Sequence, residues 1–169
     1  MDMEFLNEHP IFKGIDKEMF ISLAEDKVIV LNEGGWLFEQ GEKSDGMYVI
    51  LSGEIEVLIK DDLGKQNQFT ILSEGGVLGE IGLLTGHARS ASAKATVPSE
   101  LIFIKADIFQ GQLDAGSLVA HKMVYNLSLI LANKLEETNE HLLEVKKVIK
   151  NTGKEIADFR KKLMSDYTL

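Results

Sequence analysis

Two different patterns of apolar and polar residues divide the chain. Between Val28 and Phe109, short runs rich in Val, Ile, Leu and Phe alternate with glycines, and 11 of the 15 glycines lie between Gly34 and Gly86. Short apolar runs bounded by turn residues are typical of strands. We expect strands at 28–31, 36–38, 47–51, 55–59, 69–72, 92–96 and 101–104, with a hairpin turn at 61–65 and a short inserted helix at 81–84. This pattern predicts a mainly β domain, an antiparallel β-roll or jelly roll.

The residues before these strands predict short helices. We expect a helical turn over Phe5–Phe12 that stops at Gly14, and Asp16 can cap a second helix in which Met19, Phe20 and Leu23 share one face. We therefore expect three parts. A helical lead-in covers residues 1–27, the roll covers 28–111, and a C-terminal helical or coiled-coil segment covers 112–169.

The C-terminal segment has a heptad pattern, in which apolar or small residues recur at alternating steps of four and three. The series is Val124, Ser128, Leu131, Leu135, Thr138, Leu142, Val145, Ile149, Thr152, Ile156, Phe159 and Leu163. Such a seam on a helix of 40 residues, about 60 Å long, is longer than a small roll can cover, and it predicts a parallel two-fold homodimer. The alternative is a helix that folds back against its own domain, with a break at Gly153, since glycine weakens a helix interior by roughly 1 kcal/mol.

Charge is unevenly distributed along this chain of 169 residues with a net charge of −9. Residues 1–133 carry 10 Lys and Arg against 20 Asp and Glu, whereas residues 134–169 carry 8 against 7. The acidic main domain argues against nucleic-acid binding by this chain alone, and an anionic ligand must be attracted locally. The basic residues between 146 and 162 alternate with acidic ones, which favours a solvated helix surface.

Other absences narrow the classes of function. The sequence has no cysteine, which excludes disulfides and thiolate chemistry. It shows no signal-peptide pattern and no apolar run near the roughly 20 residues that a membrane span needs, so we expect a cytoplasmic protein without membrane contact.

Candidate binding residues gather between residues 77 and 91. Gly79 and Gly82 leave backbone amides open to a close phosphate. Arg89 offers a guanidinium fork suited to phosphate oxygens, and Ser90 adds a hydroxyl donor. These residues favour an anion-binding site.

Glu80 has a different chemistry, because a carboxylate repels phosphate but accepts hydrogen bonds from hydroxyl groups such as those of a sugar. An arginine for phosphate beside an acceptor for hydroxyls is the chemistry of a nucleotide site. From the residues alone, a glycine-rich turn with a surface ion pair between Glu80 and Arg89 explains the same stretch.

This stretch resembles the phosphate-binding cassette of cyclic nucleotide-binding domains, and the residues that carry the resemblance are Gly79-Glu80-Ile81-Gly82-Leu83-Leu84 and Arg89-Ser90-Ala91. In that family the glutamate holds the ribose 2′-hydroxyl and the arginine pairs with the cyclic phosphate. The resemblance implies these roles for Glu80 and Arg89. It also implies ligand contacts from the rest of the cassette, namely Gly79, Ile81, Gly82, Ser90 and Ala91.

The resemblance also implies a ligand and a role for the long helix. The cassette is similar to that of the bacterial catabolite activator branch, which favours cAMP, although a serine after the arginine also suits cGMP. In that branch the helix after the roll dimerises and covers the base, so Thr138 and Asn139 are expected to contact the base in one subunit or its partner. Thr138 equally fits a polar seam position that sets the register of the dimer.

We expect a regulatory sensor, with no enzymatic activity, no cofactor and no metal. The four histidines lie singly at positions 9, 87, 121 and 141, without metal-binding spacing. A Ser–His–Asp hydrolase signature is also absent. The sequence does not identify the downstream effector. Two alternatives stay open: a truncated or partner-dependent transcription regulator of the catabolite activator type, and a structural roll that has lost its ligand. About 25 residues follow the dimer helix, too few for a helix-turn-helix reader.

Overall fold

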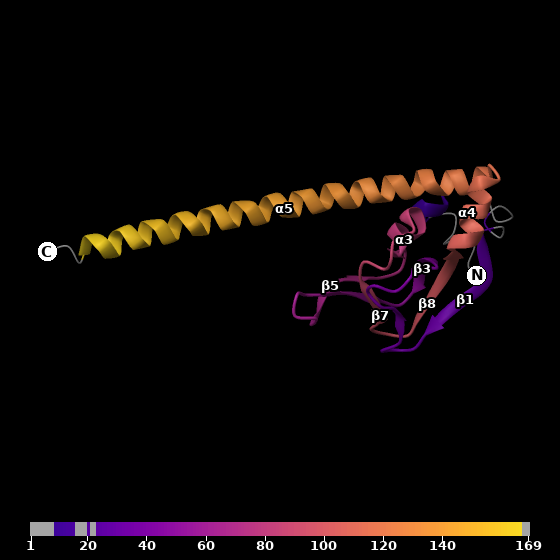
Figure 1. The fold of residues 1–169 in the computed structure, drawn as a ribbon, viewed down its shortest axis with the longest axis horizontal. Coiled ribbons are helices and arrows are strands. Elements are labelled where there is room, and N and C mark those ends of the chain that lie inside the picture. The colour runs from indigo at the N-terminus through magenta and orange to yellow at the C-terminus, as the bar shows by residue number, and fades with distance from the viewer. Residues whose placement is uncertain (1–8, 16–19, 21–22, 167–169) are drawn as a thin grey trace. The chain divides into compact units, whose positions relative to one another are not determined.

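The chain forms two compact units, residues 1–127 and residues 128–169. The computed structural model describes residues 9–15, 20 and 23–166. The first unit contains the described strands and two of the helices, α3 (Glu80–Thr85) and α4 (Ala106–Asp114) (Figure 1). The second unit consists of most of helix α5 (Leu118–Asp166).

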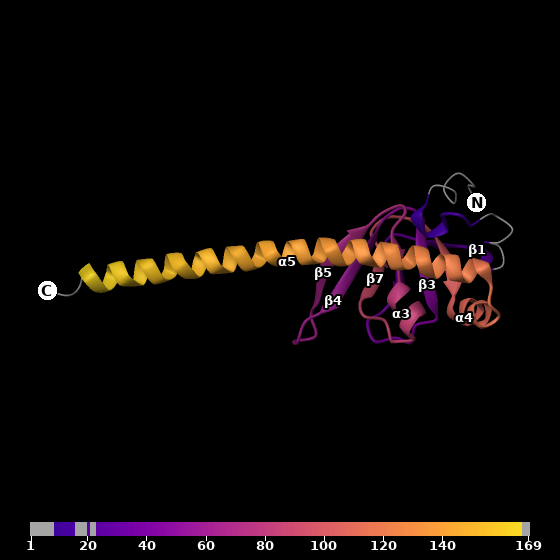
Figure 2. The ribbon, with the colours of Figure 1, turned by 90° about the horizontal axis from the view of Figure 1, so that it is seen from above.

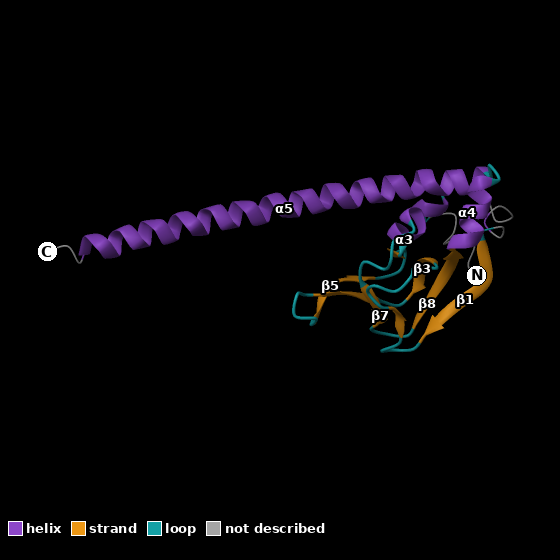
Figure 3. Ribbon diagram, in the orientation of Figure 1, coloured by secondary structure: helices purple, strands orange, loops and turns teal. Residues whose placement is uncertain are grey.

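The described strands of the first unit form two four-stranded antiparallel sheets (Figure 3). One sheet has the order β1-β8-β3-β6 and the other has the order β2-β7-β4-β5. The strands are β1 (Ala24–Leu31), β2 (Trp36–Phe38), β3 (Gly46–Ser52), β4 (Ile55–Lys60), β5 (Gln66–Leu72), β6 (Val77–Leu78), β7 (Ser92–Ala95) and β8 (Ser99–Lys105). The predicted antiparallel roll is confirmed.

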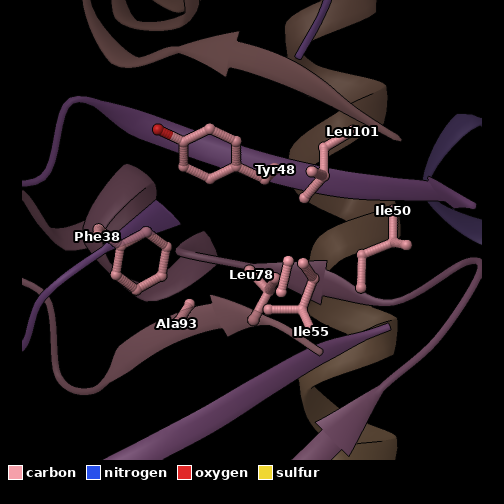
Figure 4. Close-up of a cluster of buried hydrophobic side chains, with 8 residues drawn as sticks. Phe38, Tyr48, Ile50, Ile55, Leu78, Ala93 and Leu101 are labelled. Atoms are coloured by element: carbon pink, nitrogen blue, oxygen red, sulfur yellow. The ribbon is translucent and has the colours of Figure 1, made fainter. Parts of the chain in front are cut away.

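The core of the roll lies between these two sheets, and both contribute to it. Its buried members are Tyr48, Ile50, Leu78 and Leu101 from one sheet, and Phe38, Ile55, Ala93 and Ala95 from the other. Figure 4 shows the aromatic rings at one end of this cluster and the isoleucines at the other, with the tyrosine hydroxyl pointing outward. Burial of these apolar side chains is the main favourable term in forming the roll.

The predicted hairpin turn joins β4 and β5. The Asp61 amide donates to the Lys65 carbonyl at 2.9 Å, and the Asp61 carboxylate accepts hydrogen bonds from the amides of Leu63 and Lys65. Asp is favoured at such positions because its side chain satisfies turn amides that have no strand partner.

Several elements differ from the sequence prediction. Strand β6 has only two residues, and helix α4 follows β8 without an intervening loop. The sequence indicated neither element. Helix α3 confirms the predicted short helix, and the lead-in contains a 3₁₀ helix, η1 (Pro10–Phe12). Most of the predicted lead-in helix that begins at Asp16 lies outside the described residues.

Helix α5 is continuous over 49 residues and passes through Gly153 without a break (Figure 2). At 1.5 Å per residue its length is about 74 Å. A single glycine costs a helix roughly 1 kcal/mol, which favourable neighbours can offset. None of the helices in the described part of the chain is long and apolar enough to cross a membrane.

Hydrogen bonds fix the lead-in to other parts of the first unit. The buried His9 donates from Nε2 to the Gly75 carbonyl at 2.7 Å and accepts at Nδ1 from the Ile11 amide. The buried Asn126 of α5 donates to the carbonyls of Ile11 and Lys13 at 2.9 and 3.0 Å. Both ring nitrogens of His9 are therefore engaged, and the neutral form with a proton on Nε2 fits these partners.

Burial lowers the pKa of His9 below its ordinary value of 6.5, and the hydrogen bond to Gly75 opposes this shift only in part. The unfolded chain therefore binds a proton at a higher pH than the folded chain. The stability from neutral His9 is complete above about pH 6.5 and is lost as the pH falls toward the folded pKa.

Urea unfolding between pH 7.5 and 5 should show this loss of unfolding free energy in the wild type and a smaller loss in His9→Gln. His87→Gln, at an exposed position, is the control, and its unfolding free energy should change with pH as that of the wild type does. The same change of unfolding free energy with pH in all three proteins would contradict the assignment of this pH dependence to His9.

Candidate functional site

The glycine-rich stretch forms the end of β6, helix α3 and the segment before β7. Gly79 occupies the N-cap of α3 with φ 78°, in the left-handed region that favours glycine. Glu80, the first residue of the helix, is buried. A side chain at Gly79 would collide with Nη1 of Arg89 and would approach the Gly46 carbonyl within 3.0 Å. The arginine therefore lies against the bare backbone of the cassette.

Arg89 is only 4% exposed, which is rare for an arginine. Its Nη1 donates to the Gly46 carbonyl at 2.7 Å, and its Nη2 donates to Oδ1 of Asp45 at 2.6 Å. Its backbone amide also donates to the Glu42 carbonyl, which fixes the segment to the β2–β3 loop. Within the described residues its buried Nε has no hydrogen-bond partner. The Nε donor therefore remains available for a ligand.

Two aromatic rings complete the surroundings of this guanidinium. Its carbon Cζ lies 4.2 Å from the ring centre of Phe38 and 5.4 Å from that of Tyr48. Such cation–π contacts partly replace lost hydration of the charge. Burial raises the pKa of the Tyr48 hydroxyl, and the negative charge of Asp45 raises it further, while Arg89 opposes both effects.

A cavity of about 470 Å³ borders the arginine. Its walls include Phe38, Tyr48 and Arg89, the loop residues 42–45, and residues 105–107 at the start of α4. Cationic and acidic side chains both line it, namely Lys43, Arg89 and Lys105 together with Glu42, Asp45 and Asp107. The cavity has room for a small organic ligand.

The other predicted cassette residues lie in different surroundings. Gly82 is buried against Ser44, whose hydroxyl a side chain at position 82 would hit. Ile81 and Ser90 are exposed, and Ala91 is half-buried. The structure thus places Gly79 against Arg89, whereas Glu80 does not line the cavity.

Thr138 and Asn139 belong to the second unit. Both are exposed on α5, and the Thr138 hydroxyl donates to the Lys134 carbonyl at 2.7 Å, one turn earlier in the helix. Their expected contact with a base stays a prediction.

The sequence did not identify the residues that surround the arginine from β2, β3 and their connecting loop. These residues are Phe38, Asp45, Gly46 and Tyr48. A buried arginine calls for a carboxylate, but the chain holds 27 Asp and Glu residues and local spacing does not single one out. In the described part of the chain no group of three His, Cys, Asp or Glu residues is arranged to hold a metal ion.

We predict that Gly79→Ala destabilises the fold more than Gly64→Ala does. The two glycines have nearly equal φ values, 78° and 79°, so alanine suffers a similar backbone penalty of about 1–2 kcal/mol at both. Only at position 79 would the new methyl group meet another side chain, since nothing lies within 4 Å of a Cβ at position 64. Urea titration should therefore show an additional loss of at least about 1 kcal/mol for Gly79→Ala. Equal losses would show that the close approach of Arg89 has no energetic weight.

Comparisons with known proteins find relatives in sequence and in fold. The regulator described as "cAMP-activated global transcriptional regulator CRP" from Pasteurella multocida is 35% identical over 107 residues, which are 63% of this chain and 49% of that protein. The crystal structure of the Thermus thermophilus catabolite activator protein is similar with a TM-score of 0.65 and 28% identity, over 79% of this chain and 61% of that one. A cyclic nucleotide-binding domain from Methylobacillus flagellatus has the same fold, with a TM-score of 0.71 and 21% identity over 83% of this chain and 80% of its own.

The chain spans about half the length of the curated relatives it matches first. The family model described as "Cyclic nucleotide-binding domain" matches residues 28–115, which is more than half of the 169 residues. The match begins in β1 and ends just after α4, so it includes both sheets, α3 and Arg89. The chain belongs to the cyclic nucleotide-binding domain family.

Proposed function

We propose that this chain is a regulatory sensor that binds a cyclic nucleotide in its roll. Arg89 pairs with the cyclic phosphate, and Glu80 accepts a hydrogen bond from the ribose 2′-hydroxyl. The amides of Gly79 and Gly82 and the hydroxyl of Ser90 add donors, and Ile81 and Ala91 pack against the ligand. The protein regulates rather than catalyses, and it needs no metal or cofactor.

The observation that carries this proposal is the state of Arg89. Its guanidinium is 4% exposed, borders a cavity and retains a buried Nε without a described partner. A buried donor without an acceptor is costly, by roughly 1–3 kcal/mol. A phosphate oxygen would satisfy it and would also supply negative charge in a site shielded from water.

We propose cAMP rather than cGMP as the ligand. The support comes from the curated relatives, which are described as cAMP-activated regulators and match more than 60% of this chain. Thr138 and Asn139 are the proposed base contacts, from the same subunit or its partner. Because these relatives are transcriptional regulators, the proposed site of action is the cytoplasm.

We further propose that α5 forms a parallel homodimer, which passes the binding signal onward. In the single chain six apolar seam residues of the second unit are exposed, namely Leu135, Leu142, Val145, Ile149, Ile156 and Phe159. A continuous helix cannot bury such a stripe by itself, whereas two helices bury it against each other. If the dimer has two conformations, the ligand shifts the equilibrium toward the one that it binds more tightly, and only by the difference between its two affinities.

A second candidate is a transcription regulator whose DNA-reading part is supplied outside these residues or by another chain. The observation that favours it is that the curated relatives are transcriptional regulators about twice the matched length. The effector of the sensor would then be DNA. A gel-shift assay on the protein as purified from its native cells, with any chain that copurifies with it, distinguishes this candidate from a sensor that acts on another protein.

Isothermal titration with cAMP and cGMP tests the role of Arg89. Protein that has been unfolded and refolded, to remove any bound nucleotide, should bind cAMP with micromolar or better affinity. Arg89→Ala should weaken binding on the order of 100-fold, because a charge-assisted, fork-shaped contact is lost. Arg89→Lys keeps the charge without the fork and should give an intermediate loss, with circular dichroism confirming that both variants fold.

Two results of this titration would count against parts of the proposal. If folded protein binds neither nucleotide, the chain is a roll with another ligand or with none. If 2′-deoxy-cAMP binds as tightly as cAMP, Glu80 does not hold the ribose hydroxyl.

The dimer proposal predicts different effects of one substitution at two adjacent positions. Leu142 lies on the heptad seam and Leu143 lies beside it, and the two side chains are 49% and 57% exposed in the single chain. Leu142→Asp buries a carboxylate at the dimer contact and should raise the dimer dissociation constant at least tenfold, or about 1.4 kcal/mol. Leu143→Asp should leave it nearly unchanged. Sedimentation equilibrium measures the dissociation constants of both variants. An unchanged constant for Leu142→Asp would refute dimerisation through the heptad seam.

A further inference from the structure

One ion pair in the site has unequal partners. The Arg89 side chain is 2% exposed, whereas the Asp45 side chain that contacts it is 63% exposed. The arginine is thus buried inside the roll, while the carboxylate contacts it from the solvent-exposed side. In the described structure Asp45 is the carboxylate that pairs with this guanidinium.

A ligand phosphate would need the positive charge of Arg89, which Asp45 neutralises in this structure. The guanidinium of Arg89 has three nitrogens: Nη1 donates to the Gly46 carbonyl, Nη2 donates to Asp45, and Nε has no described partner. A phosphate that takes Nε in a two-pronged contact also needs a terminal nitrogen. If Asp45 stayed in place, two anions would lie side by side on one guanidinium, which is unfavourable, although water around the exposed carboxylate reduces the repulsion.

The cavity provides room for the carboxylate to leave. Asp45 forms part of its wall together with Lys43 and Lys105, and the volume is about 470 Å³. A carboxylate that turns away from Arg89 therefore stays near positive charge and solvent. Its main chain remains held, because the Asp45 carbonyl accepts a hydrogen bond from the Ala106 amide of α4 at 2.8 Å.

We propose that Asp45 is a built-in competitor for Arg89, which neutralises the arginine without ligand and is displaced when an anionic ligand binds. This inference rests on the proposed nucleotide function of Arg89. The ligand affinity measured for the wild type then reflects the free energy of the contact between Arg89 and the phosphate, less that of the contact between Arg89 and Asp45 that it replaces. Asp45 thereby sets the ligand concentration at which the sensor responds.

The test compares two substitutions that remove the same charge from the same cavity wall. Asp45→Asn weakens the competing contact but keeps an acceptor for the arginine. Asp107→Asn removes a carboxylate that pairs with Lys105 at 3.4 Å and does not contact Arg89. Titration with cAMP and with cGMP at fixed salt should show Asp45→Asn binding roughly three- to tenfold tighter than the wild type, a modest gain because the pair is partly solvated. Asp107→Asn should stay within about twofold of the wild type.

Each outcome of this test is informative. Binding by Asp45→Asn alone, with none by the wild type, would support the proposal most strongly. Unchanged or weaker binding by folded Asp45→Asn would overturn it and leave the nucleotide function intact, since Asp45 would then position the arginine. An equal gain in Asp107→Asn would also overturn it, because the effect would be one of general charge. No binding by any of the proteins would remove the nucleotide function together with this inference. If Asp45→Asn does not fold, Asp45→Ala repeats the comparison.

Discussion

The burial of one positive charge governs the structure around the site. Removing a guanidinium from water costs several kcal/mol unless hydrogen bonds and an opposite charge replace the lost hydration. Arg89 receives this compensation from the Gly46 carbonyl, the Asp45 carboxylate and the ring of Phe38. Gly46 belongs to β3 and Phe38 belongs to β2, so the contacts come from both sheets. The arginine thus connects the cassette to the two layers of the roll.

This constraint explains other features of the site. Glycine at position 79 leaves space for the guanidinium and adopts a left-handed conformation at the start of α3, while Gly82 lets the same helix pack on Ser44. The charge is still incompletely satisfied, because Nε lacks a partner within the described residues. A site that is formed in advance, with one donor unsatisfied and an exposed carboxylate as its counter-charge, is suited to exchange that carboxylate for a ligand anion.

Local patterns in the sequence predicted much of this architecture. The glycine-bounded apolar runs predicted seven of the strands, and the heptad series predicted the long helix. Both are local signals, because each is a pattern among residues that are close together along the chain. The contiguous cassette motif predicted the family and singled out Arg89. The two-residue strand β6 was too short for any periodicity, and α4 follows β8 without turn residues to mark its start. The pairing of Asp45 with Arg89 joins residues 44 positions apart and depends on the fold of the roll, so no local pattern could reveal it.

A crystal structure of the protein with cAMP is the most direct test of the central claim, that Arg89 is the phosphate-binding group of the roll. The account predicts a phosphate oxygen within about 3 Å of the Arg89 guanidinium, with Nε as one of its donors. A nucleotide bound with its phosphate away from Arg89, while the guanidinium keeps its contacts to Asp45 and Gly46, would contradict it.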